Sequence, residues 1–224
     1  MHNKAGRIAS IENDKPSLVG TESERPESRK RDMIIRAGAE TFMEQGFEAA
    51  SMDEVARRAG VSKATIYSHF ESKHALFGAI VNGRCQAMIP KITAAALDDQ
   101  PPAEALRSTG RSFLDLILSP GPLSLYRTVL AEAPRFPELG RNFYDAGPNL
   151  VAQALADYLA RQHALGVLDV PTPRLSAEQF FGMVLGHAHL RMLLGIDGTP
   201  PGADERDRIV ERAVQTFLHG VTKR

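Results

Sequence analysis

The chain has 224 residues, enough for one large domain or two smaller ones, and 43% of them are hydrophobic, as in an ordinary globular protein. Its 27 basic and 27 acidic residues cancel, so any binding of nucleic acid must depend on local clusters of charge. Cys85 is the only cysteine, which excludes an intrachain disulfide and a cysteine-rich zinc site. We find no apolar run that could span a bilayer and no secretory signal, and therefore expect a cytoplasmic protein.

The first part of the chain is polar and shows no helical periodicity, so we expect a disordered N-terminal arm over residues 1–28. The alternative is a basic arm that reaches along DNA, but Lys4 and Arg7 are outnumbered there by acidic residues. Apolar and small side chains then recur at helical spacing. This pattern predicts a first helix over residues 29–45, ended by Gly46.

Residues 51–70 predict two short helices joined by a tight turn. Ser51 can cap the first helix, and Glu54 can complete a capping box with it. Gly60 suits the left-handed end of that helix, and Ser62 can cap the second one. The residues expected on the buried sides are Val55, Ala56, Ala59, Ile66 and Phe70. Together they predict a helix-turn-helix motif, whose second helix enters the major groove of DNA.

Residues 29–81 resemble the DNA-binding domain of the TetR family of bacterial transcriptional regulators. Three segments carry the resemblance: AGAETFMEQGFEAASM, DEVARRAGVSKATIYSHF and ESKHALF. The resemblance implies a TetR-type DNA-binding domain over residues 29–89. It also implies a helical domain for effector binding and dimerisation over residues 90–224, in which a shorter segment, 129–147, resembles the effector domains of one subset of the family.

The remaining sequence has helical signals and no stretch with the alternation of a β-strand. We therefore expect an all-α protein, with an N-terminal three-helix DNA-binding domain and a larger C-terminal helical bundle that dimerises. The helices predicted after residue 70 cover residues 72–90, 103–118, 123–132, 137–144, 148–163, 176–194 and 204–220. The triplet 120–122, Pro-Gly-Pro, is expected to break the chain between two of them, and Ser176 with Gln179 is expected to cap another.

The last two predicted helices suggest an interface between two copies of the chain. Gly182 and Gly186 lie four residues apart and would let another helix approach closely. The final helix carries an apolar band that is wide for the edge of a monomer. We place the homodimer interface at Phe181, Gly182, Leu185, Gly186, Ala213 and Phe217.

The DNA contacts are expected at the start and on the exposed side of the second helix of the motif. The candidate residues are Ser51, Ser62, Lys63, Ala64, Thr65, Tyr67, Ser68, His69 and Lys73. We expect Lys63 to read a guanine edge, the alternative being a solvated surface lysine. The resemblance implies phosphate contacts for Thr65, Tyr67 and Lys73, and the alternative for Tyr67 is a tyrosine packed in the core.

A small-molecule effector is expected in the C-terminal domain, although core packing is the alternative for each candidate. The candidates are Phe113, Leu116, Tyr126, Phe143, Met183, His187 and Arg191. His187 and Arg191 share a helix face and could hold an anion, whereas His187 and His189 point to different faces and cannot chelate one metal ion. We expect no cofactor and no metal ion, and we expect Cys85 to be a buried structural thiol rather than a redox sensor.

These features predict a sequence-specific transcriptional regulator, a repressor that a small molecule releases from a palindromic operator. One alternative is a DNA-binding protein that uses the same motif without any effector. The other is an enzyme acting on a small metabolite, but the sequence contains no nucleophile elbow, phosphate loop or zinc-ligand spacing. An open cavity in the C-terminal domain would favour the ligand-responsive regulator over the effector-independent DNA-binding protein.

Overall fold

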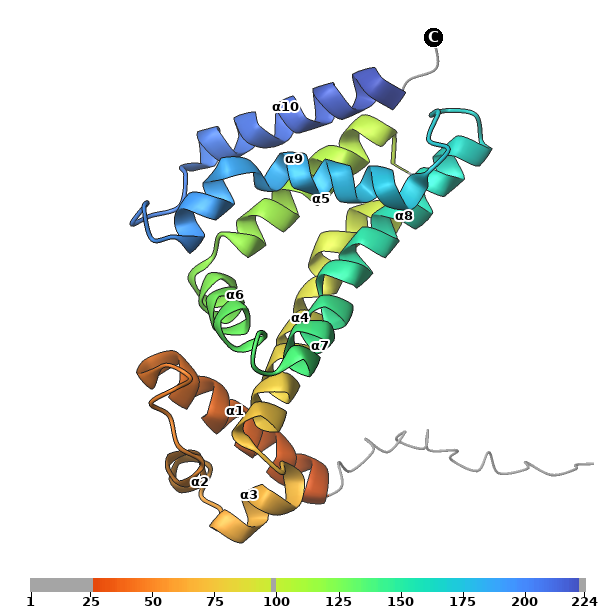
Figure 1. Ribbon diagram of the computed structural model, residues 1–224. Coiled ribbons are helices and arrows are strands. Elements are labelled where there is room, and N and C mark those ends of the chain that lie inside the picture. Colours follow the sequence, from red (N-terminus) through yellow and green to blue (C-terminus); the bar gives the residue numbers. More distant parts are fainter. Residues whose placement is uncertain (1–25, 98–99, 222–224) are drawn as a thin grey trace, which may run out of the picture.

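The computed structural model describes residues 26–97 and 100–221, which form helices connected by short loops (Figure 1). The helices are α1 (Pro26–Gln45), α2 (Met52–Ala59), α3 (Lys63–His69), α4 (Lys73–Leu97), α5 (Pro102–Ile117), α6 (Pro120–Glu132), α7 (Pro137–Ala146), α8 (Pro148–Ala164), α9 (Pro173–Leu193) and α10 (Ala203–Val221). This part of the chain contains no strand, so the predicted all-α class is confirmed. None of the described helices is long and apolar enough to cross a membrane.

A small N-terminal lobe, which we call the head, consists of α1, α2, α3 and the first turns of α4. Its core is a cluster of aromatic and aliphatic side chains, in which Phe42 lies 5.3 Å from Phe47 and 5.7 Å from Phe77, measured between ring centroids. Ile66 of α3 and Phe70, directly after it, are buried in the same cluster. Burial of these side chains fixes the orientation of α3 relative to α1.

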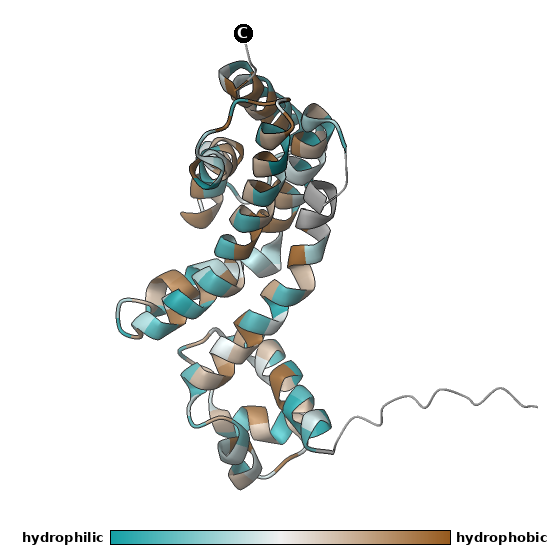
Figure 2. Cartoon of the chain, turned by 90° about the vertical axis from the view of Figure 1, so that its right-hand side faces the viewer, coloured by the Kyte–Doolittle hydropathy of each residue, from teal (hydrophilic) through white to brown (hydrophobic). Residues whose placement is uncertain are grey.

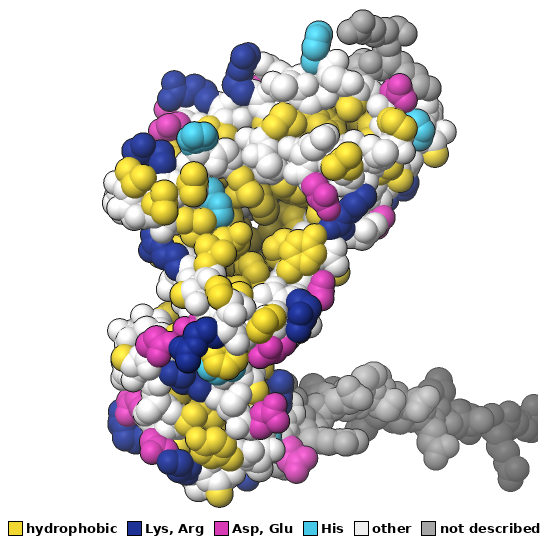
Figure 3. All heavy atoms as spheres, in the orientation of Figure 1, with side chains coloured by type: hydrophobic (Ala, Val, Ile, Leu, Met, Phe, Trp, Pro, Cys, Tyr) yellow, Lys and Arg dark blue, Asp and Glu magenta, His cyan; other side chains and the backbone are white. Residues whose placement is uncertain are grey.

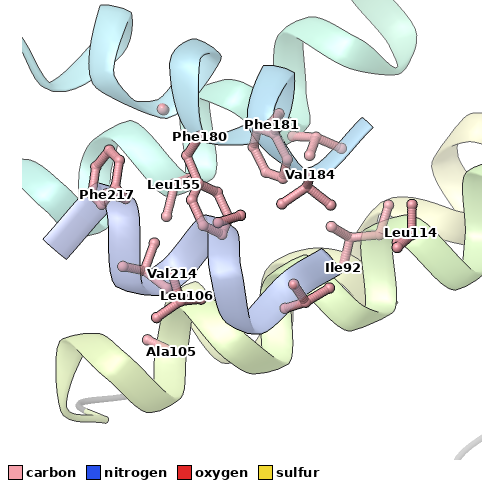
Figure 4. Close-up of a cluster of buried hydrophobic side chains, with 14 of the residues drawn as sticks. Ile92, Ala105, Leu106, Leu114, Leu155, Phe180, Phe181, Val184, Val214 and Phe217 are labelled. Carbon is pink, nitrogen blue, oxygen red and sulfur yellow. The ribbon is translucent and has the colours of Figure 1, made fainter. Parts of the chain in front are cut away.

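A larger lobe, which we call the body, contains α5 to α10 and the second half of α4. Figure 4 shows its core, where Phe180 and Val184 of α9 face Leu106 of α5 and Val214 of α10. A Cβ atom added at Gly110 would lie 3.0 Å from Val210 Cγ1, so this glycine allows α5 to lie close to α10. Figure 2 shows the same two lobes from the side, joined by α4.

Helix α4 does not end at Pro90, as the sequence predicts, but continues to Leu97. The proline removes one hydrogen bond from the helix, but the chain beyond it is held by packing, because Ile92 is 3% exposed within the core of the body. A single helix therefore extends from the head into the body, where it lies beside α8 (Figure 1).

Three other predicted helix boundaries are wrong for a common reason. Helix α1 begins at Pro26 instead of residue 29, α6 begins at Pro120 instead of residue 123, and α9 begins at Pro173 instead of residue 176. Proline fits the first turn of a helix because its fixed φ is helical and the N–H it lacks would have no partner there. These prolines start helices, whereas we placed Pro26 in the N-terminal arm and interpreted Pro120 as part of a break.

Two details of α9 and of the N-terminus also differ from the prediction. Ser176 lies inside α9 and is buried, so it is not the predicted helix cap. Gly186 has φ 45° and ψ −150°, which interrupts the regular helix within α9. Of the predicted N-terminal arm, residues 26–28 are helical, and residues 1–25 lie outside the described part of the chain.

Candidate DNA-binding helix and ligand cavity

The turn between α2 and α3 is fixed by local hydrogen bonds. Ser51 Oγ accepts a hydrogen bond from the Glu54 N–H at 3.2 Å, and Ser62 Oγ accepts one from the Thr65 N–H at 3.1 Å. Between them Gly60 adopts φ 65° and ψ 32°, the left-handed conformation expected of it. The two serines therefore cap the two helices of the motif as predicted.

The outer side of α3 is accessible to a partner molecule. Tyr67 is 46% exposed, which excludes the alternative of a core tyrosine, and Ser62, Lys63, Ala64 and Ser68 are exposed as well. Thr65 and His69 are half-buried, and the Thr65 hydroxyl lies 2.8 Å from that of Ser62. Short hydroxyls, a phenol and one ammonium group thus share the free surface of one helix, as direct contacts to DNA require.

The Lys63 ammonium pairs with Asp53 of α2, at 2.7 Å from Oδ1. This carboxylate raises the pKa of Lys63 by hydrogen bonding, so the lysine stays charged. Both side chains are more than 60% exposed, and an ion pair in that setting contributes little stability. A phosphate or a base edge can therefore replace Asp53 as the partner of Lys63.

Two arginines of α2 form ion pairs with carboxylates of the head. Arg57 and Arg58 both donate to Glu54, and Arg58 also donates to Glu44 of α1, 2.5 Å from Nη2. Hydrogen bonds from Arg57 and Arg58 lower the pKa of Glu54 to about 2. The Glu54 carboxylate therefore binds arginines instead of completing the predicted capping box, and it joins α2 to α1 through Arg58.

The phosphate contact expected of Lys73 is not supported by the structure. Its ammonium donates to the carbonyls of Phe47, Glu48 and Ala50, at 2.7, 3.1 and 3.2 Å, and lies 4.5 Å from the centre of the Phe47 ring. A lysine has three N–H donors, so none remains for DNA. Lys73 instead holds the loop between α1 and α2 against the start of α4.

The body contains a cavity of about 300 Å³, bordered by α4 to α9. Figure 3 shows a hollow in the body that is lined by hydrophobic side chains. Four expected effector residues line the cavity: Phe113, Leu116, Tyr126 and Phe143. Helix α4 contributes Cys85, Met88, Ile89 and Ile92, which the sequence analysis does not assign to the effector site. Cys85 is buried as expected, and burial raises the pKa of its thiol.

Three expected effector residues lie elsewhere. Met183 faces a surface groove between α9 and α10, His187 is exposed, and Arg191 pairs with Asp197 at 2.6 Å. The histidine at the cavity is His189, which is not among the predicted effector residues. Phe181, Leu185 and His189 recur every four residues and all line the cavity, although Gly186 interrupts the regular helix between the last two.

The polar groups at the cavity come mainly from α9. Arg174 Nε donates to Glu178 Oε1 at 2.7 Å, and its other nitrogens donate to Asn149 O, Gln153 Oε1 and Tyr144 Oη. His189 is 7% exposed, and its Nε2 has no hydrogen-bond partner in the described part of the chain. Burial lowers the pKa of His189, which keeps the imidazole neutral at pH 7.

The predicted dimer residues do not form one exposed surface. Phe181, Ala213 and Phe217 are buried in the core of their own chain, and Leu185 lines the cavity. The apolar band of α10 that we assigned to a second subunit instead packs on α5 and α9 of the same chain. Gly182 and Gly186 remain exposed, and a Cβ atom at either position would meet nothing within 4 Å.

A helix-turn-helix with a free outer face, joined by one long helix to a helical body, defines a DNA-binding transcriptional regulator. Two family models match the chain: one described as bacterial regulatory proteins of the tetR family, over residues 34–80, and one described as the C-terminal domain of AefR-like transcriptional repressors, over residues 104–220. The protein belongs to the TetR family of transcriptional regulators.

Two curated relatives resemble the chain over part of its length. The transcriptional activator FasR of Mycolicibacterium smegmatis is 34% identical over 41% of this chain and 42% of its own length. The transcriptional repressor KstR2 of Rhodococcus jostii is 30% identical over 39% of this chain and 45% of its own length. Each match therefore spans less than half of the relative.

Two solved structures match nearly the whole chain. A protein described as a TetR-family regulator from Mesorhizobium loti has a TM-score of 0.83 and 27% identity, over 89% of this chain and 100% of that one. The flavonoid-responsive regulator FrrA has a TM-score of 0.72 and 35% identity, over 88% of this chain and 98% of that one.

Proposed function

We propose that this protein is a homodimeric repressor that binds a palindromic operator through α3 and is released when a small molecule enters the cavity of the body. The observation that carries the proposal is the position of α4. Its residues Leu76, Phe77 and Ile80 belong to the core of the head, whereas Met88, Ile89 and Ile92 line the cavity. A ligand that pushes on these last side chains would move the helix on which the head is built.

The exposed side of α3 would supply the contacts to the operator. Lys63 would exchange Asp53 for a guanine edge, and the hydroxyls of Thr65 and Tyr67 would bind phosphates. Since one head reads only a few base pairs, two heads held at a fixed spacing would give the site its length and symmetry.

The proposed dimer contact is an apolar and small-residue stripe on the outside of α9. Its exposed members are Leu175, Gly182, Gly186, Leu190 and, directly after the helix, Leu194, and the exposed Gln179 lies between the first two. It continues into a shallow groove beside Thr216 and Gly220 of α10. This stripe replaces the buried residues named in the sequence analysis as the surface that a second subunit would cover.

The sign of regulation is part of the proposal. The family model that matches the body is described as the C-terminal domain of AefR-like transcriptional repressors. Among the relatives, KstR2 is a repressor and FasR is an activator. The repressor description of the family model that matches the body supports repression. Ligand release is supported by the cavity, which an effector-independent protein would have no reason to keep open.

Selection of bound DNA from a random pool tests the proposal. We expect enrichment of a palindrome whose half-sites lie about 34–36 Å apart or a multiple of that spacing. In fluorescence anisotropy at fixed salt, Lys63→Ala should weaken binding of the selected duplex and relax the preference at one base pair of each half-site. A pool without enrichment, or an operator bound equally well by Lys63→Ala, would contradict the proposed mode of reading.

A further inference from the structure

The cavity combines an apolar lining with very few polar groups that are free to bind a ligand. Phe113 and Phe181 lie 4.6 Å apart, and Tyr126 and Phe143 lie 5.4 Å apart, measured between ring centroids. These four rings come from α5, α9, α6 and α7, so aromatic faces and edges border the space from several helices. Aromatic pairs in offset-stacked or edge-to-face contacts contribute free energy beyond that of the area they bury, so a ring would gain from binding here.

The positive charge at this cavity is already compensated. Among the described residues that line it, Arg174 is the only lysine or arginine, and its guanidinium is bound to Glu178 and to three other oxygen atoms. A carboxylate entering the cavity would therefore find no free cation and would face the charge of Glu178. An unpaired charge in an apolar site is costly.

His189 is the exception among the polar groups. Its ring is buried and lies edge-on to Tyr126 at 5.3 Å, and no residue within 26–97 or 100–221 supplies a hydrogen-bond partner for Nε2. A buried polar atom without a hydrogen bond lowers stability. A ligand that supplies this hydrogen bond therefore gains binding free energy. Because the imidazole is neutral, Nε2 offers a donor in one tautomer or an acceptor in the other to an uncharged group, and no charge to an anion.

We propose that the ligand of this cavity is an uncharged aromatic molecule with one hydroxyl or carbonyl group that hydrogen-bonds His189, and that carboxylates are excluded by the Arg174–Glu178 pair. The inference rests on the proposed function, since it names the chemical class of the effector. The likeness to FrrA, described as responsive to flavonoids, which are aromatic compounds, agrees with it.

Isothermal titration calorimetry of the full chain with four probes tests this assignment. The probes are 2-naphthol, 2-naphthoate, naphthalene and 1-decanol at pH 7. We expect 2-naphthol to bind at least about 10-fold more tightly than 2-naphthoate, because the carboxylate is charged. We expect it to bind about 5-fold more tightly than naphthalene, because naphthalene cannot hydrogen-bond. Equal affinity for the phenol and the carboxylate would overturn the inference, as would tighter binding of 1-decanol.

Two variants assign the selectivity to residues. In His189→Phe the advantage of 2-naphthol over naphthalene should disappear while naphthalene still binds, and His189→Gln should restore part of it. In Glu178→Gln the uncompensated Arg174 should improve binding of 2-naphthoate by about 3-fold and leave 2-naphthol unchanged. Unchanged selectivity in His189→Phe would show a merely structural histidine and contradict the proposal.

Operator binding by the same preparation separates this inference from the proposed function. A protein that binds its selected operator but none of the four probes contradicts the inference alone. A protein that binds 2-naphthol as expected, yet enriches no DNA sequence, contradicts the proposed function and leaves the ligand class standing.

Discussion

Lys73 connects the first turn of α4 to the loop that follows α1, through three backbone carbonyls. Lys73→Met keeps the length of the side chain but leaves these carbonyls without their donor. We expect a loss of about 1–3 kcal/mol in the free energy of unfolding, measured in urea. Lys63→Met is the matched control, because Lys63 is exposed, and it should not change stability. Equal stability of both variants would mean that Lys73 does not hold the head together.

Glu54 gives the head a defined pH dependence. Its pKa in the folded state is about 2, because Arg57 and Arg58 bind the carboxylate, and its ordinary value is 4.5. A lowered carboxyl pKa stabilises the folded state above the ordinary value, and the contribution is lost as the pH falls from about 4.5 towards 2. Glu54→Gln should therefore be less stable than the wild type at pH 7 and 5, with a smaller difference at pH 3.5. A difference that stays constant across these urea titrations would contradict this account.

At the residue scale, the sequence predicts what depends on near neighbours. The caps at Ser51 and Ser62, the left-handed Gly60 and the exposure of Tyr67 follow from spacing along the motif. The partners of Lys73 lie more than twenty residues away, and Glu44, which binds Arg58, lies fourteen residues away. Such contacts depend on how α1 packs beside α2 and α4, which no local pattern encodes.

Gly186 interrupts α9 in a conformation that residues with a side chain rarely adopt, with φ 45° and ψ −150°. Gly186→Ala should lower stability by about 1–3 kcal/mol, because the alanine is strained whatever space surrounds it. Gly83→Ala is the control. Gly83 lies within α4 and has open space around it, so the alanine should add roughly 0.5–1 kcal/mol. The two variants should shift the thermal midpoint in opposite directions, and a stable Gly186→Ala would contradict the observed break.

At the element scale, the errors concern what each helix packs against. The periodicity of α10 shows an apolar band but not its partner, and α5 and α9 of the same chain bury that band. Pro120 and Pro90 have different effects because the packing around each proline differs. One begins α6, and the other is carried inside α4 because the body holds Ile92 beyond it. The existence and type of the helices could be predicted, whereas their packing and some of their ends could not.

At the scale of the whole molecule, the exposed stripe of α9 predicts a homodimer. Leu190→Glu places a charge within the stripe and should shift the protein to a monomer in analytical ultracentrifugation, with weaker binding of a palindromic duplex. Leu165→Glu is the matched control, because Leu165 is 73% exposed at the end of α8 and lies outside the stripe. A dimer that survives Leu190→Glu, or is lost only with Leu165→Glu, would place the interface elsewhere.

The central claim is that one helix, α4, couples occupation of the cavity to the position of α3. Operator affinity at fixed salt, measured with and without a compound that binds the cavity, tests it most directly. The compound is first shown to raise the melting temperature of the wild type but not of a variant with a filled cavity, such as Ala152→Phe. We predict that it weakens operator binding about 5- to 150-fold, the usual range of such couplings. An operator affinity that stays the same with the cavity saturated would contradict the claim.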